Sequence, residues 1–224
     1  MRDKVLPPHS EAELFERADA LAGRTLAWLA AEFGIAVPED LRRDKGWIGH
    51  LLEHVLGATA GSRAEPDFPQ IGVEMKTLPV SEKGVPKEST YVCRARMDLQ
   101  PTWEACWLNQ KLSRVLWIPI IGGAATSVGD RIIGAPLLWS PSAEEQAQLR
   151  ADWEELTDLI SQGDLWQIEG GRGEVLQLRP KGANSRDMVW AMDDEGSWVQ
   201  ENPRGFYLRP SFTRALLKKH LHIG

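Results

Sequence analysis

The sequence is poor in several features that would assign a protein to a class at once. Its 224 residues include only two cysteines, Cys93 and Cys106, too few for the disulfide framework of a secreted domain. The longest apolar run, residues 115–125, is interrupted by Pro119 and two glycines, whereas a membrane-spanning helix needs about 20 apolar residues. Residues 1–8 lack the apolar core of a signal peptide. We therefore expect a protein of the reducing cytoplasm.

Two common catalytic signatures are missing as well. The glycine-rich segments 122–123 and 170–173 have neither the spacing nor the lysine of a phosphate-binding loop, and no serine sits in a nucleophile elbow. No internal repeat or low-complexity tract is present. The composition is that of a folded domain, with 42% hydrophobic and 26% charged residues.

The net charge of −6 is unevenly distributed along the chain. The segment 144–169 contains eight acidic residues and one arginine, so the rest of the chain carries a net charge of +1. From Arg204 to the end there are five basic residues and no acidic one. Separated faces of this kind allow a protein of acidic pI to bind a polyanion. Solvated helix faces explain the same pattern equally well.

Hydrophobic periodicity and turn signals predict an α/β fold with a mixed sheet flanked by helices. We expect helices at 10–23, 25–33, 47–56, 107–112, 142–160 and 211–221, and strands at 71–80, 91–97, 114–121 and 174–179. The ten tryptophans are expected to be mostly structural, with core positions for Trp28, Trp117 and Trp153. Residues 1–224 are expected to form a single domain, with 57–66 as a hinge between two lobes.

The most informative local pattern is Asp67 followed by Glu74 and Lys76. Alternation predicts a half-buried strand that carries Glu74 and Lys76 on one face, with Asp67 on the turn before it. Two converging carboxylates suit Mg²⁺, and an ammonium beside them can orient a water and stabilise a phosphate. A Glu-x-Lys triplet arises by chance about once in a chain of this size. On these residues alone, polar positions on a solvent-facing strand are the more frequent explanation.

A second pattern lies on the helix expected at 47–56. His50, Glu53 and His54 match H-x-x-E-H, in which two histidines one turn apart bind zinc and the glutamate acts as a base. A catalytic zinc site needs a third protein ligand, and none stands out among the later acidic residues. Packing or surface positions for both histidines are therefore favoured over a zinc peptidase.

Together with longer stretches, the Asp67, Glu74 and Lys76 pattern resembles the restriction-endonuclease superfamily and, within it, the MutH family of mismatch-repair endonucleases. The similar stretches run in order along most of the chain: 43–49, 51–53, 57–58, 67–68, 72–77 (Gly-Val-Glu-Met-Lys-Thr), 114–119 (Arg-Val-Leu-Trp-Ile-Pro), 136–141, 179–181 and 203–208 (Pro-Arg-Gly-Phe-Tyr-Leu). Ordered agreement over this span is far more specific than the triplet alone.

The resemblance implies a monomeric, Mg²⁺-dependent endonuclease with two lobes around a DNA cleft. It implies nicking of the unmethylated strand at hemimethylated GATC sites, after activation by a MutL-type partner. The acidic helix at 142–160 is a candidate surface for that partner. A dimeric restriction-type nuclease and a DNA-binding module without catalysis are the alternatives. The intact Asp67, Glu74 and Lys76 disfavour the second of them.

The resemblance also implies roles for catalytic residues. Asp67, Glu74 and the carbonyl of Met75 would hold the metal, and Lys76 would act on the attacking water. Glu53 would be a further carboxylate near the metal, and Lys111 would be a lysine near the active centre, although the chain around 98–110 matches the family poorly.

Six residues are implied in DNA binding: Lys45, Tyr91, Arg179, Pro180, Lys181 and Tyr207. Arg179, Pro180 and Lys181 match residues that read or flank the recognition bases, Tyr207 matches the sensor of adenine methylation, and Lys45 matches a loop that approaches the duplex. Arginine can contact guanine in two places, whereas lysine mostly meets phosphate. Tyr91 departs from the family, which has phenylalanine at this position.

Overall fold

The computed structural model describes residues 5–86, 88–97, 101–123, 125–164, 168, 172–181, 188–193 and 195–221. Some residues discussed in the sequence analysis lie outside these ranges. They are Glu169 of the acidic segment, Gly170 and Gly171 of the glycine-rich segment, and residues 98–100. The chain forms two compact units and passes between them at four points. The first unit contains 1–87, 114–140 and 216–224, and the second contains 88–113 and 141–215.

The expected hinge at 57–66 lies within the first unit. Motion at this segment stays a prediction. None of the helices formed by the described residues is both long and apolar enough to cross a membrane.

Three helices open the first unit: α1 (Glu11–Asp19), α2 (Leu26–Phe33) and α3 (Trp47–Leu56). Their ends follow from local chemistry, because the side chains of Ser10 and Thr25 accept hydrogen bonds from the first-turn N–H groups of α1 and α2. Gly57 ends α3 with φ of +82°, and a Cβ there would lie 2.5 Å from the Leu6 carbonyl oxygen, so only glycine fits. The helices expected at 25–33 and 47–56 are confirmed.

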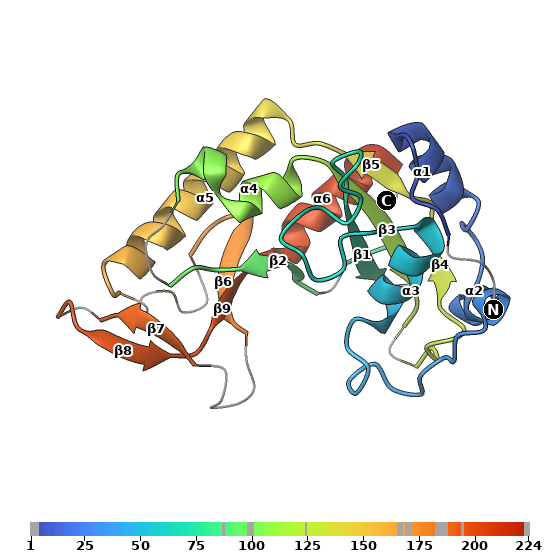
Figure 1. Cartoon of the computed structure of the whole chain (residues 1–224), viewed down its shortest axis with the longest axis horizontal. Coiled ribbons are helices and arrows are strands. Elements are labelled where there is room, and N and C mark those ends of the chain that lie inside the picture. The colour runs from blue at the N-terminus through green and yellow to red at the C-terminus, as the bar shows by residue number, and fades with distance from the viewer. Residues whose placement is uncertain are drawn as a thin grey trace. The chain divides into compact units, whose positions relative to one another are not determined.

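The first unit has a mixed four-stranded sheet (Figure 1) built on β3 (Val115–Ile121). On one side β1 (Glu74–Val80) pairs parallel to β3, and on the other β4 (Ile132–Ile133) and β5 (Leu137–Trp139) pair antiparallel to it. Residues of α1, α2 and α3 share one hydrophobic core with Met75, Leu116, Ile118 and Ile120 of the sheet. The expected α/β class, with helices on a mixed sheet, is confirmed.

The expectation of a half-buried strand at 71–80 was wrong in two respects. The strand β1 begins at Glu74, because residues 68–73 form a turn in front of it. Glu74 and Lys76 are only 3% and 9% exposed, so both faces of the strand are covered at this end. Alternating polar and apolar residues normally indicate one wet face, but a strand paired in parallel within a mixed sheet is commonly buried on both sides.

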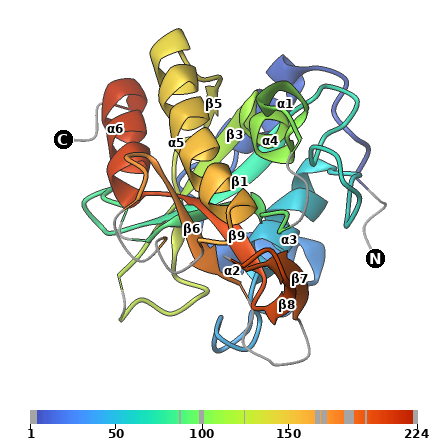
Figure 2. The same cartoon turned by 90° about the vertical axis from the view of Figure 1, so that its left-hand side faces the viewer.

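The second unit contains an antiparallel three-stranded sheet in the order β2 (Thr90–Arg94), β9 (Arg204–Leu208) and β6 (Leu176–Pro180). Two helices pack against this sheet, α4 (Trp107–Leu112) against β2 and α5 (Ala143–Ser161) against β6. A short helix η1 (Trp103–Ala105) contacts α5, and β7 (Val189–Met192) and β8 (Trp198–Glu201) form a separate hairpin (Figure 2). The last helix, α6 (Pro210–Leu221), continues from the second unit into the first.

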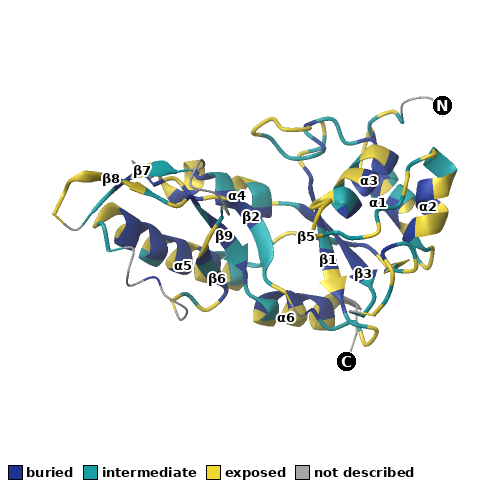
Figure 3. Cartoon of the chain, turned by 90° about the horizontal axis from the view of Figure 1, so that it is seen from below, coloured by how far each residue is buried: buried dark blue, intermediate teal, exposed yellow. Residues whose placement is uncertain are grey.

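The helix α5 organises the second unit. Ser142 and Glu145 form a reciprocal capping box at its start, and the helix shows one buried and one exposed face (Figure 3). Asp152 is buried within it and accepts hydrogen bonds from the backbone N–H groups of residues 174, 175 and 176 at 3.0, 2.7 and 2.7 Å. This carboxylate fixes the start of β6 to the helix.

Two of the three tryptophans expected in the core are buried there, Trp117 and Trp153. Trp28 is 41% exposed, so its predicted core position was wrong. The helix α2 reads Leu-Ala-Trp-Leu-Ala-Ala-Glu-Phe and is apolar around most of its circumference, so periodicity could not select its buried face. The fold buries Leu26, Leu29 and Ala30, and the Arg24 guanidinium lies 4.8 Å from the centroid of the Trp28 ring.

Candidate functional site

A tight turn holds Asp67 beside the start of β1. Phe68 and Val73 exchange backbone hydrogen bonds, with N–O distances of 2.9 and 3.3 Å, and Gly72 takes a φ of +66° between them. The Asp67 carbonyl oxygen accepts hydrogen bonds from the N–H groups of Thr59 and Ala60, which follow α3. The turn and the end of α3 therefore fix the position of Asp67 from both sides.

The Asp67 carboxylate is bonded to the strand itself. Oδ2 of Asp67 accepts a hydrogen bond from the Met75 N–H at 2.8 Å. The preceding N–H, that of Glu74, donates to the Arg114 carbonyl on the β3 side. Successive residues of a strand direct their backbone groups to opposite sides. The N–H and carbonyl of Met75 therefore both face the side of β1 away from β3, where the Asp67 carboxylate lies.

Next to this contact lies a buried ion pair. The Lys76 ammonium donates to Oε1 of Glu74 at 3.0 Å, and the strand neighbours opposite these residues on β3 are the apolar Val115 and Trp117. Removing two charges from water costs several kcal/mol per ion, which their attraction only partly offsets. A buried acid and base that packing does not require are characteristic of functional sites.

These groups are suited to a hard divalent cation. The Asp67 carboxylate, the Glu74 carboxylate and the Met75 carbonyl are all oxygen donors, and they come from one turn and the first two residues of one strand. Within the described residues no group of three or more histidine, cysteine, aspartate or glutamate side chains could hold a metal. A site here would thus use the Met75 carbonyl and water as well as the two carboxylates, as Mg²⁺ sites usually do.

The remaining candidates on α3 lie close to this turn in sequence. Glu53 is half-buried, and a Cβ on Gly49 would lie 3.7 Å from its Oε1, so the carboxylate extends back along the helix. His50 and His54 are exposed, and His54 packs edge-on against Phe33 with ring centroids 5.8 Å apart. The described residues contain no zinc site at these histidines. The role of Glu53 stays a prediction.

Two further charged candidates, Lys111 and Lys45, come from other elements of the chain. Lys111 is on α4 of the second unit, where its ammonium is 5.1 Å from the centroid of the Trp107 ring. Lys45 is exposed in the turn that precedes α3 in the first unit. The first unit thus contains four of the five catalytic candidates, and the place of Lys111 among them stays a prediction.

Most of the residues expected to contact DNA meet on one face of the second sheet. Tyr91 of β2 and Tyr207 of β9 are opposite each other, with ring centroids 5.3 Å apart in an edge-to-face contact. The Arg179 guanidinium lies 5.7 Å from the centroid of the Tyr207 ring, and the Lys181 ammonium lies 3.1 Å from that of Tyr91. We call these four residues the tyrosine face.

Two backbone features shape the tyrosine face. Gly205 lies opposite Arg179, and a Cβ there would lie 2.9 Å from Cε2 of Tyr91 and 3.4 Å from Cε2 of Tyr207, so glycine makes room for both rings. Pro180 ends the edge strand β6, where a residue without an N–H is tolerated, and Lys181 N–H then donates to the Pro203 carbonyl. Pro180 and Arg179 are exposed at this end of the strand.

Tyr91 has a distinctive ionisation state. Burial of its hydroxyl, with smaller contributions from Cys93 and Tyr207, raises the pKa of Tyr91 to about 12. The hydroxyl, which is protonated at neutral pH like that of any tyrosine, therefore remains a hydrogen-bond donor at pH values near 10 as well. A phenylalanine at this position would offer the same ring without that donor.

Some residues of the site were missed in the sequence. Gly205 and Asp152 act only through contacts far along the chain, at the tyrosine face and at the start of β6. The strand β9 (Arg204–Leu208) was also missed, and its residues show no regular alternation in burial. The only local signal in this strand is its pair of aromatic residues, Phe206 and Tyr207, which favour strands.

Comparison with known proteins gives one consistent result. The family model described as "DNA mismatch repair enzyme MutH" matches residues 56–152. The chain is 51% identical over 219 residues to the DNA mismatch repair protein MutH of Serratia proteamaculans, covering 97% of this chain and 96% of the relative. It is 50% identical over 217 residues to that of Shewanella sp. strain ANA-3, covering 96% and 97%. It is 52% identical over 218 residues to that of Salmonella paratyphi C, covering 96% and 94%.

Proposed function

The chain belongs to the MutH family of DNA mismatch repair enzymes, and from that premise we propose that it nicks the unmethylated strand of DNA at hemimethylated GATC sites with Mg²⁺ as its metal. It is a DNA endonuclease of mismatch repair. The observation that carries the chemistry is the Asp67 carboxylate held at the Met75 N–H beside the buried pair of Glu74 and Lys76.

In this proposal Asp67, Glu74 and the Met75 carbonyl hold the ion. Bound Mg²⁺ supplies a Lewis acid that polarises the scissile phosphate and activates water. Lys76 stabilises the negative charge that develops on the phosphate, because its ammonium is already desolvated and aligned by Glu74 at 3.0 Å. Glu53 and Lys111 complete the set as a further carboxylate and a further ammonium near the reacting phosphate.

The tyrosine face supports a role in sequence reading. Arg179 is exposed and can donate two hydrogen bonds to O6 and N7 of guanine, a contact specific to that base in the major groove. In this proposal Tyr207 tests adenine N6, because a methyl group there projects into the same groove. Lys45 and Lys181 would meet phosphates, Pro180 would flank the recognition bases, and Tyr91 would add a hydroxyl donor beside Tyr207.

Further parts of the proposal concern the state of the enzyme in the cell. We infer a monomer in the cytoplasm that a MutL-type partner activates. The helix α5 is a candidate docking surface, since Glu144, Glu154 and Asp158 are exposed on it, although Arg150 pairs with Glu154.

The proposal is tested on duplexes that contain one GATC site, with neither strand, each strand in turn, or both strands methylated. We expect Mg²⁺-dependent cleavage 5′ to the guanine, always on the unmethylated strand, and no cleavage of fully methylated DNA. Equal cleavage of fully methylated DNA would contradict methylation sensing by Tyr207. A supercoiled plasmid that becomes nicked rather than linear would separate a monomeric nickase from a dimeric restriction-type enzyme.

A control variant isolates the chemistry from binding. Lys76→Ala should bind the same duplex in Mg²⁺ with nearly unchanged affinity and cut it at least a hundredfold more slowly, since the loss of one preorganised cation costs roughly that factor. Turnover at the wild-type rate would rule out the role of Lys76. Circular dichroism of each variant shows whether the fold is kept.

A further inference from the structure

An irregularity in β2 adds a residue to the tyrosine face. The pairing of β2 with β9 shifts register between Tyr91 and Cys93. In a regular strand, residues three apart project to opposite faces, but a bulge of one residue returns them to the same face. Tyr91 pairs with Tyr207, and Arg94 pairs with Gly205. Gly205 and Tyr207 are two residues apart on β9 and therefore lie on the same face of the sheet. Arg94 therefore lies on the same face as Tyr91.

Two further observations agree with this placement. Arg94 lies in a row across the sheet with Gly205 and Arg179, because both arginines pair with that glycine from either side. The positive charge of Arg94 also acts on the Tyr91 hydroxyl, lowering its pKa against the larger effect of burial. Both agree with an Arg94 side chain on the same face as the tyrosine pair.

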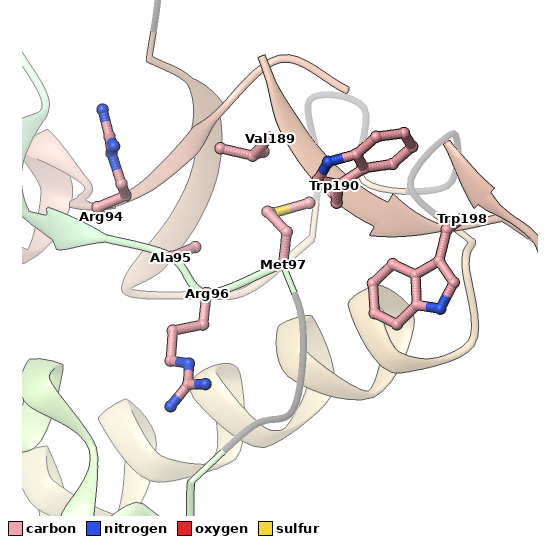
Figure 4. A pocket seen from close by; sticks show the side chains of 7 residues that line it. All are labelled: Arg94, Ala95, Arg96, Met97, Val189, Trp190 and Trp198. Carbon is pink, nitrogen blue, oxygen red and sulfur yellow. The ribbon is translucent and has the colours of Figure 1, made fainter. Parts of the chain in front are cut away.

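The side chain of Arg94 is exposed and has no hydrogen bond or ion pair with another residue of the described ranges. Two other exposed arginines of the second unit are neutralised by acidic partners, Arg150 by Glu104 and Glu154 and Arg172 by Glu155. Arg94 also borders a pocket of about 580 Å³ whose lining contains no acidic residue (Figure 4). Its charge is therefore available to an anionic ligand.

We propose that Arg94 binds a DNA phosphate and so extends the tyrosine face; this inference rests on the proposed function. The central strand β9 carries Tyr207, and β2 and β6 are its two neighbours. Neighbouring strands lie about 4.8 Å apart, and the major groove is about 12 Å wide. If the central strand faces the bases, a long side chain on β2 reaches the backbone that borders the groove.

The pocket beside Arg94 has apolar walls that include Trp190 and Trp198, which are 60% and 53% exposed. Such walls also suit a protein partner. The arrangement favours DNA because Arg94 shares its face with Arg179, Lys181 and the two tyrosines, so an anion bound there continues the surface that reads the duplex.

The test compares Arg94→Ala with Arg96→Ala, a matched control two residues away whose guanidinium points in the opposite direction (Figure 4). Binding to a GATC duplex and to a scrambled duplex is measured by fluorescence anisotropy in EDTA over a series of salt concentrations. For Arg94→Ala we expect a roughly tenfold rise in Kd on both duplexes and a fall of about 0.9 in the salt-dependence slope. Arg94→Lys should retain the slope, and Arg96→Ala should match the wild type.

Three other outcomes overturn the inference. Equal affinities and slopes for the two alanine variants would show that Arg94 does not meet phosphate. A loss confined to the GATC duplex would make it a base contact. Unchanged DNA binding with loss of activation by a partner protein would make this face a protein-docking surface. Failure of the wild type itself to bind DNA would instead refute the proposed function.

Discussion

The buried pair of Glu74 and Lys76 makes a prediction that can be tested without any DNA. Lys76→Met replaces the ammonium by an apolar side chain of similar length. It leaves the Glu74 carboxylate, only 4% exposed, in a site from which its neutralising charge has gone. If Glu74 and Lys76 form this buried pair, the variant should be less stable than the wild type. A divalent cation bound at Glu74 should restore the stability that the positive charge of Lys76 supplied.

The expected magnitude follows from the distance and the burial. At 3.0 Å and an effective dielectric constant of about 20, Coulomb's law gives an attraction of about 5.5 kcal/mol. Removing one partner of a buried pair typically costs about 3–5 kcal/mol, because the other charge stays desolvated. For a chain of this size that corresponds to a fall in Tm of roughly 6–20 °C.

The assay is urea denaturation at neutral pH in EDTA, followed by the same titration in Mg²⁺. The double variant Glu74→Gln/Lys76→Met should be more stable than Lys76→Met alone, because it also removes the buried negative charge of Glu74. Mg²⁺ at a hundredfold excess over its Kd should return about 2.7 kcal/mol to Lys76→Met. It should not do so for the double variant, whose amide is a weaker ligand.

Lys218→Met, at an exposed position of α6, is the control and should change stability by less than about 0.5 kcal/mol. The reasoning fails if Lys76→Met matches this control in EDTA. It also fails if the double variant loses as much as the sum of the two single variants, because the charges would then not be coupled.

Three further predictions concern the second unit. Asp152→Asn leaves one acceptor oxygen for three backbone N–H groups. We therefore expect the free energy of unfolding, measured by urea denaturation, to fall by about 1–3 kcal/mol. An unchanged midpoint would show that the hydrogen bonds from Asp152 to the start of β6 do not stabilise the unit. Gly205→Ala would bring a methyl group to 2.9 Å from Tyr91 and 3.2 Å from the Cys93 carbonyl. This variant should raise the Kd for a GATC duplex roughly tenfold, as expected for the loss of one aligned contact. An unchanged Kd would show that the two tyrosine rings do not need the space that Gly205 leaves. The pKa of Tyr91 is raised from 10.0 to about 12, so the folded protein holds this proton more tightly than the unfolded chain does. The contribution of Tyr91 to the free energy of unfolding is therefore fully present below pH 10 and should be lost as the pH rises towards 12. Tyr91→Phe, compared by denaturation and by absorbance of tyrosinate, should lack that loss.

Local chemistry made much of the fold predictable. The capping residues Ser10, Thr25 and Ser142 fix helix starts through hydrogen bonds that span three residues, and Gly34 and Gly57 end their helices by adopting positive φ. At the start of α1 the Glu13 carboxylate accepts a hydrogen bond from the N–H of His9, whereas the Ser10 side chain accepts one from the N–H of Glu13. Helix starts and ends of this kind can be predicted from the sequence because they depend on neighbouring residues and not on distant partners.

Predictions that needed a distant partner were less complete. Alternation located β1 but not the burial of Glu74 and Lys76, which depends on parallel pairing with β3 forty residues later in the chain. The exposure of Trp28 depends on which side of α2 meets the core. Neither could be read from a window of neighbouring residues.

The sequence by itself determined the types of residue at the candidate site and the helices and turn that carry them, because caps, glycines and hydrophobic period act over a few residues. Tertiary structure alone decided that the Asp67 carboxylate bonds to Met75, that Glu74 and Lys76 form a desolvated pair, and that a bulge turns Arg94 to the face of Tyr91. Those outcomes depend on strand pairing and register, since the energy of a charge or a hydrogen bond is set by what the whole fold places around it.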